Sequence, residues 1–161
     1  MKRIAVCGMF TALSLLFSYV ELLFPAPIPI PGIKLGLANS LIVIVLYGIG
    51  DKEALLVSFC RVLLSALLFG SMASFFYAIA GAGFSFLGMV IMKHCFKSSL
   101  MASSTAGGFL HNTGQLMVAA LLVGIKPILF YIPVLLLIGI GMGMLIGLIS
   151  REILKHVVNV L

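Results

Sequence analysis

Six long apolar segments follow one another along the chain, separated only by short polar connections. They cover residues 4–24, 35–50, 54–70, 71–92, 100–124 and 127–149. A helix needs about 20 apolar residues to cross a hydrocarbon core of about 30 Å. Only 9% of the residues are charged, against about 25% in an ordinary soluble domain. The sequence therefore predicts an all-α integral membrane protein, with six transmembrane helices forming one bundle and a single domain over residues 1–161.

The ends of the chain and one internal turn complete this division into six helices. The first segment is longer than the core of a signal peptide and no small-residue cleavage site follows it, so we expect a retained helix. The third and fourth segments are divided only by a turn near residues 69–71. The tail, residues 150–161, is predicted to lie on the cytoplasmic side, either as a surface helix or as a continuation of the last helix.

Basic residues are distributed unevenly between the connections. With six helices and the N-terminus in the cytoplasm, the cytoplasmic side holds seven basic residues: Lys2, Arg3, Lys52, Lys93, Lys97, Arg151 and Lys155. The outer side holds two, Lys34 and Lys126. This asymmetry follows the positive-inside rule and places both termini in the cytoplasm. The net charge of +6 is spread over helix ends, which indicates contact with the lipid bilayer and argues against nucleic acid.

A proline-rich connection joins the first two apolar segments. Pro25, Pro27, Pro29 and Pro31 occupy every second position, which excludes a helix and favours extended polyproline geometry. Such a stiff apolar strap on the outer face either gates a binding pocket or simply links two helices. We expect a gate over residues 25–33, because a plain linker needs neither this rigidity nor this apolar character.

Arg61 lies inside the third apolar segment. An arginine within a membrane costs at least ~2.5–3.5 kcal/mol and must face protein, water or a counter-charge. It either anchors an anionic group of a solute, forms a structural pair, or extends toward the cytoplasm. Lys34 and Glu21 are both predicted to lie near the outer surface and to flank the strap. There Lys34 either attracts the anionic group of a solute or pairs with Glu21.

The fifth apolar segment carries the most polar stretch within any predicted helix. Gln115 follows His111 by four residues and Asn112 by three, so the three side chains form one stripe. Asn39, near the outer end of the second segment, is predicted to join the same polar layer. These side chains either line a binding cavity or hydrogen-bond between helices. No second histidine or carboxylate stands at ligand spacing, so no metal site is predicted.

Small residues recur at helical spacing in several segments. Gly8 and Ala12, four residues apart in the first segment, allow another helix to approach closely. Such spacing serves internal packing or the docking of a partner subunit. The catalytic patterns are missing: the chain has a single aspartate, Asp51, and no phosphate-binding loop. We therefore predict neither enzyme activity nor a bound cofactor.

Three blocks carry a resemblance to a known family: residues 31–39 (PGIKLGLAN), residues 61–71 (RVLLSALLFGS) and residues 107–115 (GGFLHNTGQ). Together they resemble the Gx transporter family, which is also named heptaprenyl diphosphate synthase component I. That family is similar to the S components of energy-coupling factor transporters. S components are bacterial membrane proteins of six helices that bind a vitamin-like solute and associate with a T component and two ATPases.

The resemblance implies a substrate-binding subunit in a bacterial cytoplasmic membrane. Its substrate would be a vitamin-like or quinone-, flavin- or isoprenoid-related compound, which Arg61 suggests is anionic, and Gly8 and Ala12 would dock the T component. The family's second name implies instead a membrane component of polyprenyl diphosphate or quinone synthesis. This chain lacks the aspartate clusters that hold metal on a diphosphate, so in that case it would be a non-catalytic component. A self-contained channel or carrier is a third, weaker hypothesis.

Overall fold

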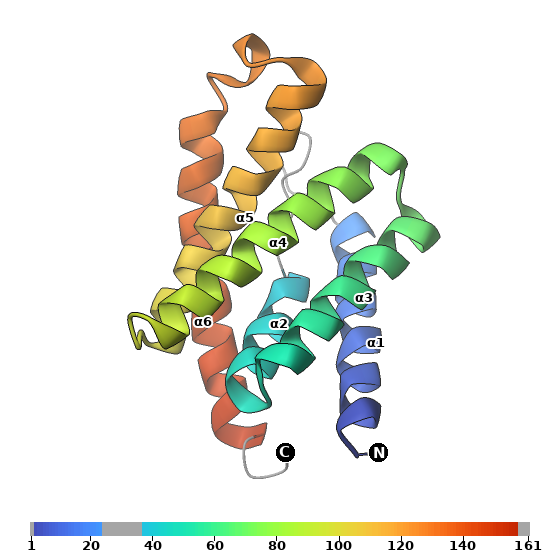
Figure 1. The fold of residues 1–161 in the computed structure, drawn as a ribbon, viewed down its shortest axis with the longest axis vertical. Helices are drawn as coiled ribbons and strands as arrows, with labels where there is room; N and C mark the ends of the chain where they lie inside the picture. The colour runs from blue at the N-terminus through green and yellow to red at the C-terminus, as the bar shows by residue number, and fades with distance from the viewer. Residues whose placement is uncertain (1, 24–36, 158–161) are drawn as a thin grey trace.

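The computed structural model describes residues 2–23 and 37–157, and all regular structure in these residues is helical (Figure 1). The elements in chain order are α1 (Lys2–Leu23), α2 (Leu37–Gly48), α3 (Asp51–Phe69), α4 (Met72–His94), α5 (Leu100–Val123), the short 3₁₀ helix η1 (Lys126–Ile128) and α6 (Ile132–Val157). Helices α1, α4, α5 and α6 are each long and apolar enough to cross a membrane. The protein is therefore a multi-pass helical membrane protein.

Two helices begin at residues other than the first residue of their apolar segments. Helix α3 begins at Asp51, three residues before the predicted start, because the apolar pattern leaves out the charged first turn. The carboxylates of Asp51 and Glu53 in that turn favour the positive end of the helix dipole. Helix α6 begins at Ile132, five residues later than predicted, because Pro127 lies in η1 and the chain turns before it enters the helix.

The turn between α3 and α4 lies where the sequence placed it. Helix α3 ends against Gly70, and Ser71 caps α4 by accepting a hydrogen bond of 3.2 Å from the backbone nitrogen of Ser74. At the other end of the chain, α6 continues without a break through Arg151 to Val157. Of the two possibilities for the tail, most of it therefore continues the last helix.

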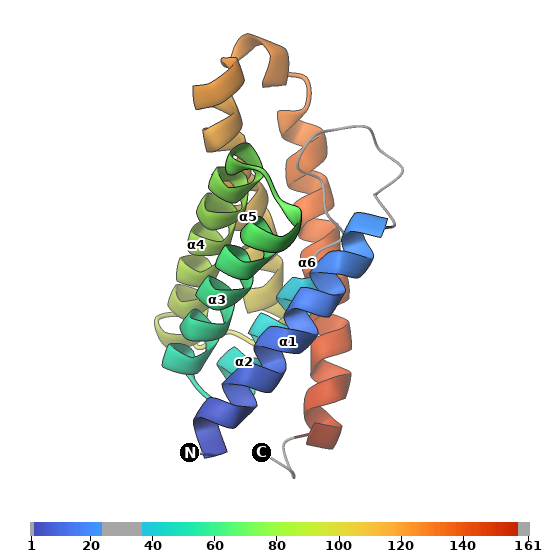
Figure 2. The ribbon, with the colours of Figure 1, turned by 90° about the vertical axis from the view of Figure 1, so that its right-hand side faces the viewer.

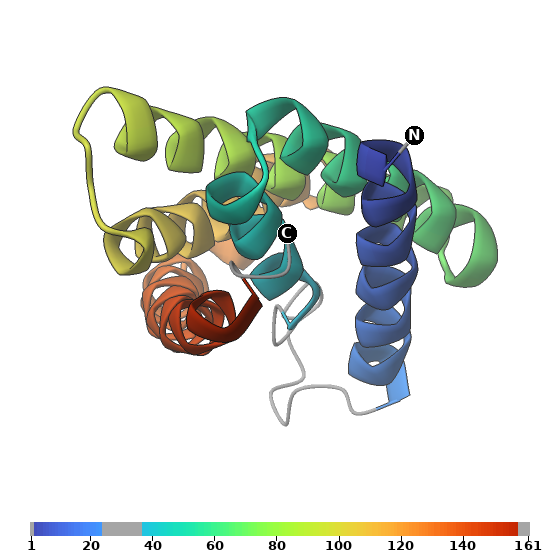
Figure 3. The same ribbon diagram turned by 90° about the horizontal axis from the view of Figure 1, so that it is seen from below.

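Helix α2 is short because it lies inside the bundle. Six consecutive residues, Leu41, Ile42, Val43, Ile44, Val45 and Leu46, are almost completely buried. A helix that is apolar on all sides needs neighbours on all sides, and α2 contacts α1, α3, α5 and α6. Seen from below, α2 lies between α1 on one side and α6 on the other (Figure 3). It joins the α1–α3 half of the bundle to the α4–α6 half.

Helices α5 and α6 approach each other through glycines. A Cβ atom added to Gly108 would lie 2.2 Å from the carbonyl oxygen of Gly139 and 3.0 Å from Cα of Gly143. The Ser104 hydroxyl donates a hydrogen bond of 2.8 Å to the carbonyl of Gly143 across the same contact. The small residues of α6 therefore serve internal packing, as their spacing indicated.

Helices α1 and α6 bring the two ends of the described chain to the same end of the bundle, the lower end in Figures 1 and 2. The α5–α6 connection lies at the opposite end. Large apolar side chains such as Leu67, Leu121 and Leu137 are exposed on the outward faces. A surface of this kind is suited to lipid and not to water.

Candidate functional site

A polar cavity lies between the two halves of the bundle. Five helices form its walls, and the lining residues are Glu21 (α1), Asn39 (α2), Arg61 (α3), Gly108, His111 and Asn112 (α5), and Ile138, Gly139, Met142, Gly143 and Ile146 (α6). Its volume is about 40 Å³, which is room for about three ordered waters at ~10–15 Å³ each. The cavity therefore accepts a small polar group as it stands, and a larger solute requires the helices to separate.

Arg61 lines this cavity from α3. Its Nη2 atom donates a hydrogen bond of 3.1 Å to Oδ1 of Asn39. The two residues meet because Asn39 stands nine residues before the end of α2 at Gly48, and Arg61 stands ten residues after the start of α3 at Asp51. The Nε atom of Arg61 is buried and has no hydrogen-bond partner among the described residues. The guanidinium thus keeps donor capacity for a bound group.

Glu21 is the member of the site that the sequence reasoning missed. It was predicted to flank the strap and was not counted in the polar layer, but it is buried, with 7% exposure, and lines the cavity. Its carboxylate is close enough to interact electrostatically with Arg61. The signal was present in the sequence: Glu21 lies within the apolar segment 4–24, and a carboxylate inside a predicted membrane helix is by default a candidate site residue.

His111 and Asn112 line the cavity from α5. Asn112 also donates a hydrogen bond of 2.6 Å from Nδ2 to the carbonyl oxygen of Leu135 in α6. Asn112 therefore combines the two alternatives for this stripe: it lines the cavity and it forms a hydrogen bond between two helices. Because the Nδ2 atom of Asn112 is held by α6, this side chain can rotate toward a bound group only if it breaks the hydrogen bond to Leu135.

Gln115 does not line the central cavity. It is 4% exposed and packs against α4, where a Cβ atom added to Gly81 would lie 3.1 Å from Cγ of Gln115. Its Nε2 atom lies 3.2 Å from Nε2 of His111, and it borders a separate cavity with Tyr77 and Tyr131. One helical turn beyond His111, the stripe has rotated away from the cavity, so Gln115 orients the imidazole of His111.

The remaining predicted site residues divide into two groups. Lys34 and the gate residues Pro25, Pro27, Pro29 and Pro31 lie outside the described residues. Gly8 and Ala12 line an exposed, largely apolar groove of about 420 Å³ between α1 and α3. A Cβ atom added to Gly8 meets no atom within 4 Å. In the described part of the chain, no helix therefore packs on Gly8.

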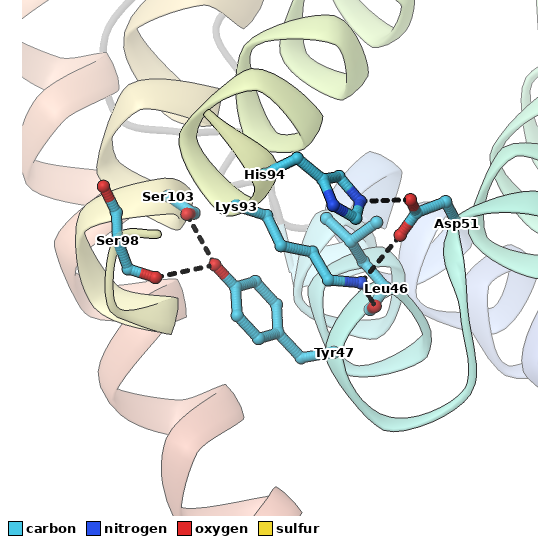
Figure 4. Close-up of polar contacts among 7 residues, drawn as sticks. All are labelled: Leu46, Tyr47, Asp51, Lys93, His94, Ser98 and Ser103. Carbon is cyan, nitrogen blue, oxygen red and sulfur yellow. Dashed lines mark hydrogen bonds and ion pairs between the residues drawn. The ribbon is translucent and has the colours of Figure 1, made fainter. Parts of the chain in front are cut away.

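A second polar cluster, which the sequence did not predict, joins four helices at the end of the bundle where the chain begins (Figure 4). Nζ of Lys93 lies 2.7 Å from Oδ1 of Asp51 and 2.7 Å from the carbonyl oxygen of Leu46. Oδ2 of Asp51 lies 2.5 Å from Nε2 of His94. The hydrogen bond from Lys93 and the contact with His94 hold the pKa of Asp51 below its ordinary value, outweighing the effect of burial.

Tyr47 extends this cluster to α5. Its hydroxyl lies 2.6 Å from Oγ of Ser103 and 3.3 Å from the carbonyl oxygen of Ser98. The Lys93 ammonium lies 5.5 Å from the centre of the Tyr47 ring, within the range of a cation–π contact. The cluster therefore ties the end of α2 to the start of α5.

The apolar outer faces and the buried polar cavity define a helical membrane protein with an internal polar site. The chain belongs to the family described as heptaprenyl diphosphate synthase component I, whose family model matches residues 10–153. No curated protein and no solved structure shows significant similarity to the chain.

Proposed function

We propose that the chain is a membrane-embedded solute-binding subunit of an energy-coupling factor type of transporter. Six helices cross the bacterial cytoplasmic membrane with both termini inside, and the central cavity holds the polar part of the solute. One observation carries this proposal: Asn39, Arg61, His111 and Asn112, from three helices, meet at a single cavity inside the bundle.

The burial of Arg61 favours a binding role over a purely structural one. A guanidinium inside a membrane bundle is costly unless its donors are used. Arg61 makes one hydrogen bond, to Asn39, and its buried Nε has no partner among the described residues. A solute that supplies acceptors to the remaining donors gains hydrogen bonds without requiring a new charge to be buried.

The position of the site favours uptake from the outer side. Glu21 lies in the last turn of α1, and Asn39 lies in the first turn of α2. Both helix ends adjoin the predicted proline strap, while the basic residues gather at the opposite end. The strap would open the way to the cavity, and its movement would provide the space that a vitamin-sized solute needs.

The groove at Gly8 and Ala12 is proposed to dock the partner that drives transport. It is open and largely apolar, and its wall on α1 runs from Ile4 to Leu15, about three helical turns. A helix of a T component fits such a surface, because small residues allow close backbone approach in lipid. The two ATPases would then act through that partner.

A second candidate function follows from the family's description. The chain would be a non-catalytic membrane component of polyprenyl (heptaprenyl) diphosphate or quinone synthesis. It would hold a soluble synthase at the membrane, since Asp51 is its only aspartate and no metal-binding cluster for a diphosphate is present in the sequence.

Affinity purification of the tagged chain from its own membranes separates the two. The transporter proposal predicts an ATPase module and a T component. It also predicts their loss from Gly8→Leu, which places a larger side chain in the groove at a position where an added Cβ atom meets no atom within 4 Å. Gly83→Leu is the matched control, because a Cβ atom there also meets no atom within 4 Å. Recovery of a soluble prenyl synthase, with no ATPase, would contradict the transporter proposal.

A further inference from the structure

A second cavity lies at the end of the bundle where α5 connects to α6 (Figure 1). Its walls come from α4, α5, η1 and α6, and no residue of the described chain lines both this cavity and the central one. Tyr77 and Tyr131 contribute aromatic rings, and most of the other lining side chains are aliphatic. Its volume is about 160 Å³. An apolar cavity of about 150 Å³ holds one benzene molecule, so this cavity has room for a single six-membered ring.

Gln115 places an amide in this otherwise aromatic and aliphatic lining. The side chain is 4% exposed, and its Nε2 atom lies 3.2 Å from Nε2 of His111. The Oε1 atom of Gln115 is buried and has no hydrogen-bond partner among the described residues. A buried carbonyl oxygen without a partner is costly, because it has lost its hydrogen bonds to water. The wall of the cavity therefore carries an acceptor that a bound group can satisfy.

From the size of the cavity and this open acceptor we infer a binding site for a phenol-like group, a six-membered ring that carries a hydroxyl. The ring occupies the space that Tyr77 and Tyr131 line, and the hydroxyl donates a hydrogen bond to Oε1 of Gln115. A hydroxyl both donates and accepts, so it suits this position in either orientation of the amide. The site is separate from the central cavity, whose role it does not depend on.

Other classes of ligand satisfy only part of these observations. No charged side chain lines the cavity among the described residues, so an ion would be buried there without a counter-charge. A hydrocarbon such as a lipid acyl chain would fill the space but leave Oε1 of Gln115 without a partner. A neutral ring with one hydroxyl matches the apolar lining and the acceptor together.

The cavity is accessible from the surface of the bundle. Two of its lining residues, Val123 and Tyr131, are 62% and 44% exposed. Tyrosine is enriched where a membrane helix meets the interface between lipid and water, and a phenol-like group also combines an apolar ring with a polar end. A ligand dissolved in the membrane therefore reaches this site without passing through the bundle.

The test compares phenol with toluene, two probes of the same shape that differ in one hydroxyl. Their dissociation constants are measured by ligand-observed NMR on the full chain in nanodiscs, and empty nanodiscs give the correction for partition into lipid. The wild type is expected to bind phenol about tenfold more tightly than toluene, because only phenol satisfies the buried acceptor. Gln115→Leu removes the acceptor at similar size and is expected to bind toluene at least as tightly as phenol.

Tyr131→Ala tests the wall of the cavity independently of Gln115. It removes a lining ring and is expected to weaken the binding of both probes by about tenfold. Phe130→Ala is the matched control, because this neighbouring aromatic side chain is 88% exposed and is not part of the lining; both constants are expected to stay unchanged. Circular dichroism and size-exclusion chromatography check folding, and the Tyr131 and Phe130 variants suffice if Gln115→Leu does not fold.

Three results would overturn the inference. They are a wild type that binds neither probe or does not prefer phenol, a phenol preference that persists in folded Gln115→Leu, and binding that Tyr131→Ala leaves unchanged. A wild type that prefers toluene would indicate a site for a lipid acyl chain instead. None of these results changes the lining of the central cavity, so the failure of this inference is distinguishable from the failure of the proposed function.

Discussion

Replacing Gly108 by alanine tests the contact that closes the cavity between α5 and α6. The added Cβ atom would lie 2.2 Å from the carbonyl oxygen of Gly139, whereas ordinary contact begins near 3.4 Å. Since the nearest atoms are backbone, no side chain can rotate away. Helix α6 must therefore move back by about 1.2 Å.

The energetic cost follows from what that movement breaks. The hydrogen bonds from Ser104 to Gly143, at 2.8 Å, and from Asn112 to Leu135, at 2.6 Å, span the same helix pair. Each contributes about 0.6 kcal/mol in a membrane protein, and overpacking adds about 1–3 kcal/mol. Alanine recovers up to about 1 kcal/mol of helix propensity. We expect a net destabilisation of about 1.5–3 kcal/mol.

The chain offers its own reporter for this measurement. Cys7 is buried, with 5% exposure, and reacts with a thiol-specific dye only on unfolding once Cys60 and Cys95 are replaced by serine. Thermal unfolding of Gly108→Ala in this background is expected to shift down by on the order of 5 °C. Gly141→Ala is the matched control in α6, because a Cβ atom there meets nothing within 4 Å.

Equal melting temperatures for Gly108→Ala and Gly141→Ala would refute the reasoning. They would mean that α5 and α6 are not packed backbone to backbone at this point, and the wall of the cavity would have to be placed differently.

Two further predictions concern the polar contacts. The pKa of Asp51 is lowered in the folded state, so its stabilising contribution is present above pH about 3.8 and is lost as the pH falls below that value. Melting temperatures measured from pH 3 to 6 should show this loss in the wild type but not in Asp51→Asn. The same pH dependence in both proteins would contradict the prediction. Asn112→Ala removes the hydrogen bond to Leu135 and should lower the free energy of unfolding by about 0.6–1.7 kcal/mol, measured with the Cys7 reporter; an unchanged value would show that the bond contributes nothing.

The helical fold could be predicted from the sequence because apolar length determines it. The limits of α4 and α5 lie within two residues of the predicted segments. The start of α3 was missed because the apolar pattern does not count the charged turn with Asp51. The central place of α2 was not predictable either. A helix buried in the bundle and a helix that faces lipid are both apolar on all sides, and only the neighbouring helices distinguish the two cases.

The candidate site could be predicted in part. Arg61, His111 and Asn112 were identifiable because polar side chains inside apolar segments are rare. Which of them share one cavity depends on helix rotation, and Gln115 turns away from it. Glu21 was assigned only to the region that flanks the strap because its segment ends three residues later, whereas the structure buries it in the lining of the cavity that also contains Arg61.

Native mass spectrometry of the gently solubilised chain tests the central claim, that the polar cavity binds a solute, most directly. A retained small molecule is expected on the wild type. It is expected to be lost from Arg61→Ala and kept by the control Arg151→Ala, whose side chain is exposed on α6. Equal retention by both variants would place the solute elsewhere. A wild type that carries no solute and copurifies with a soluble synthase would make the cavity structural and contradict the account.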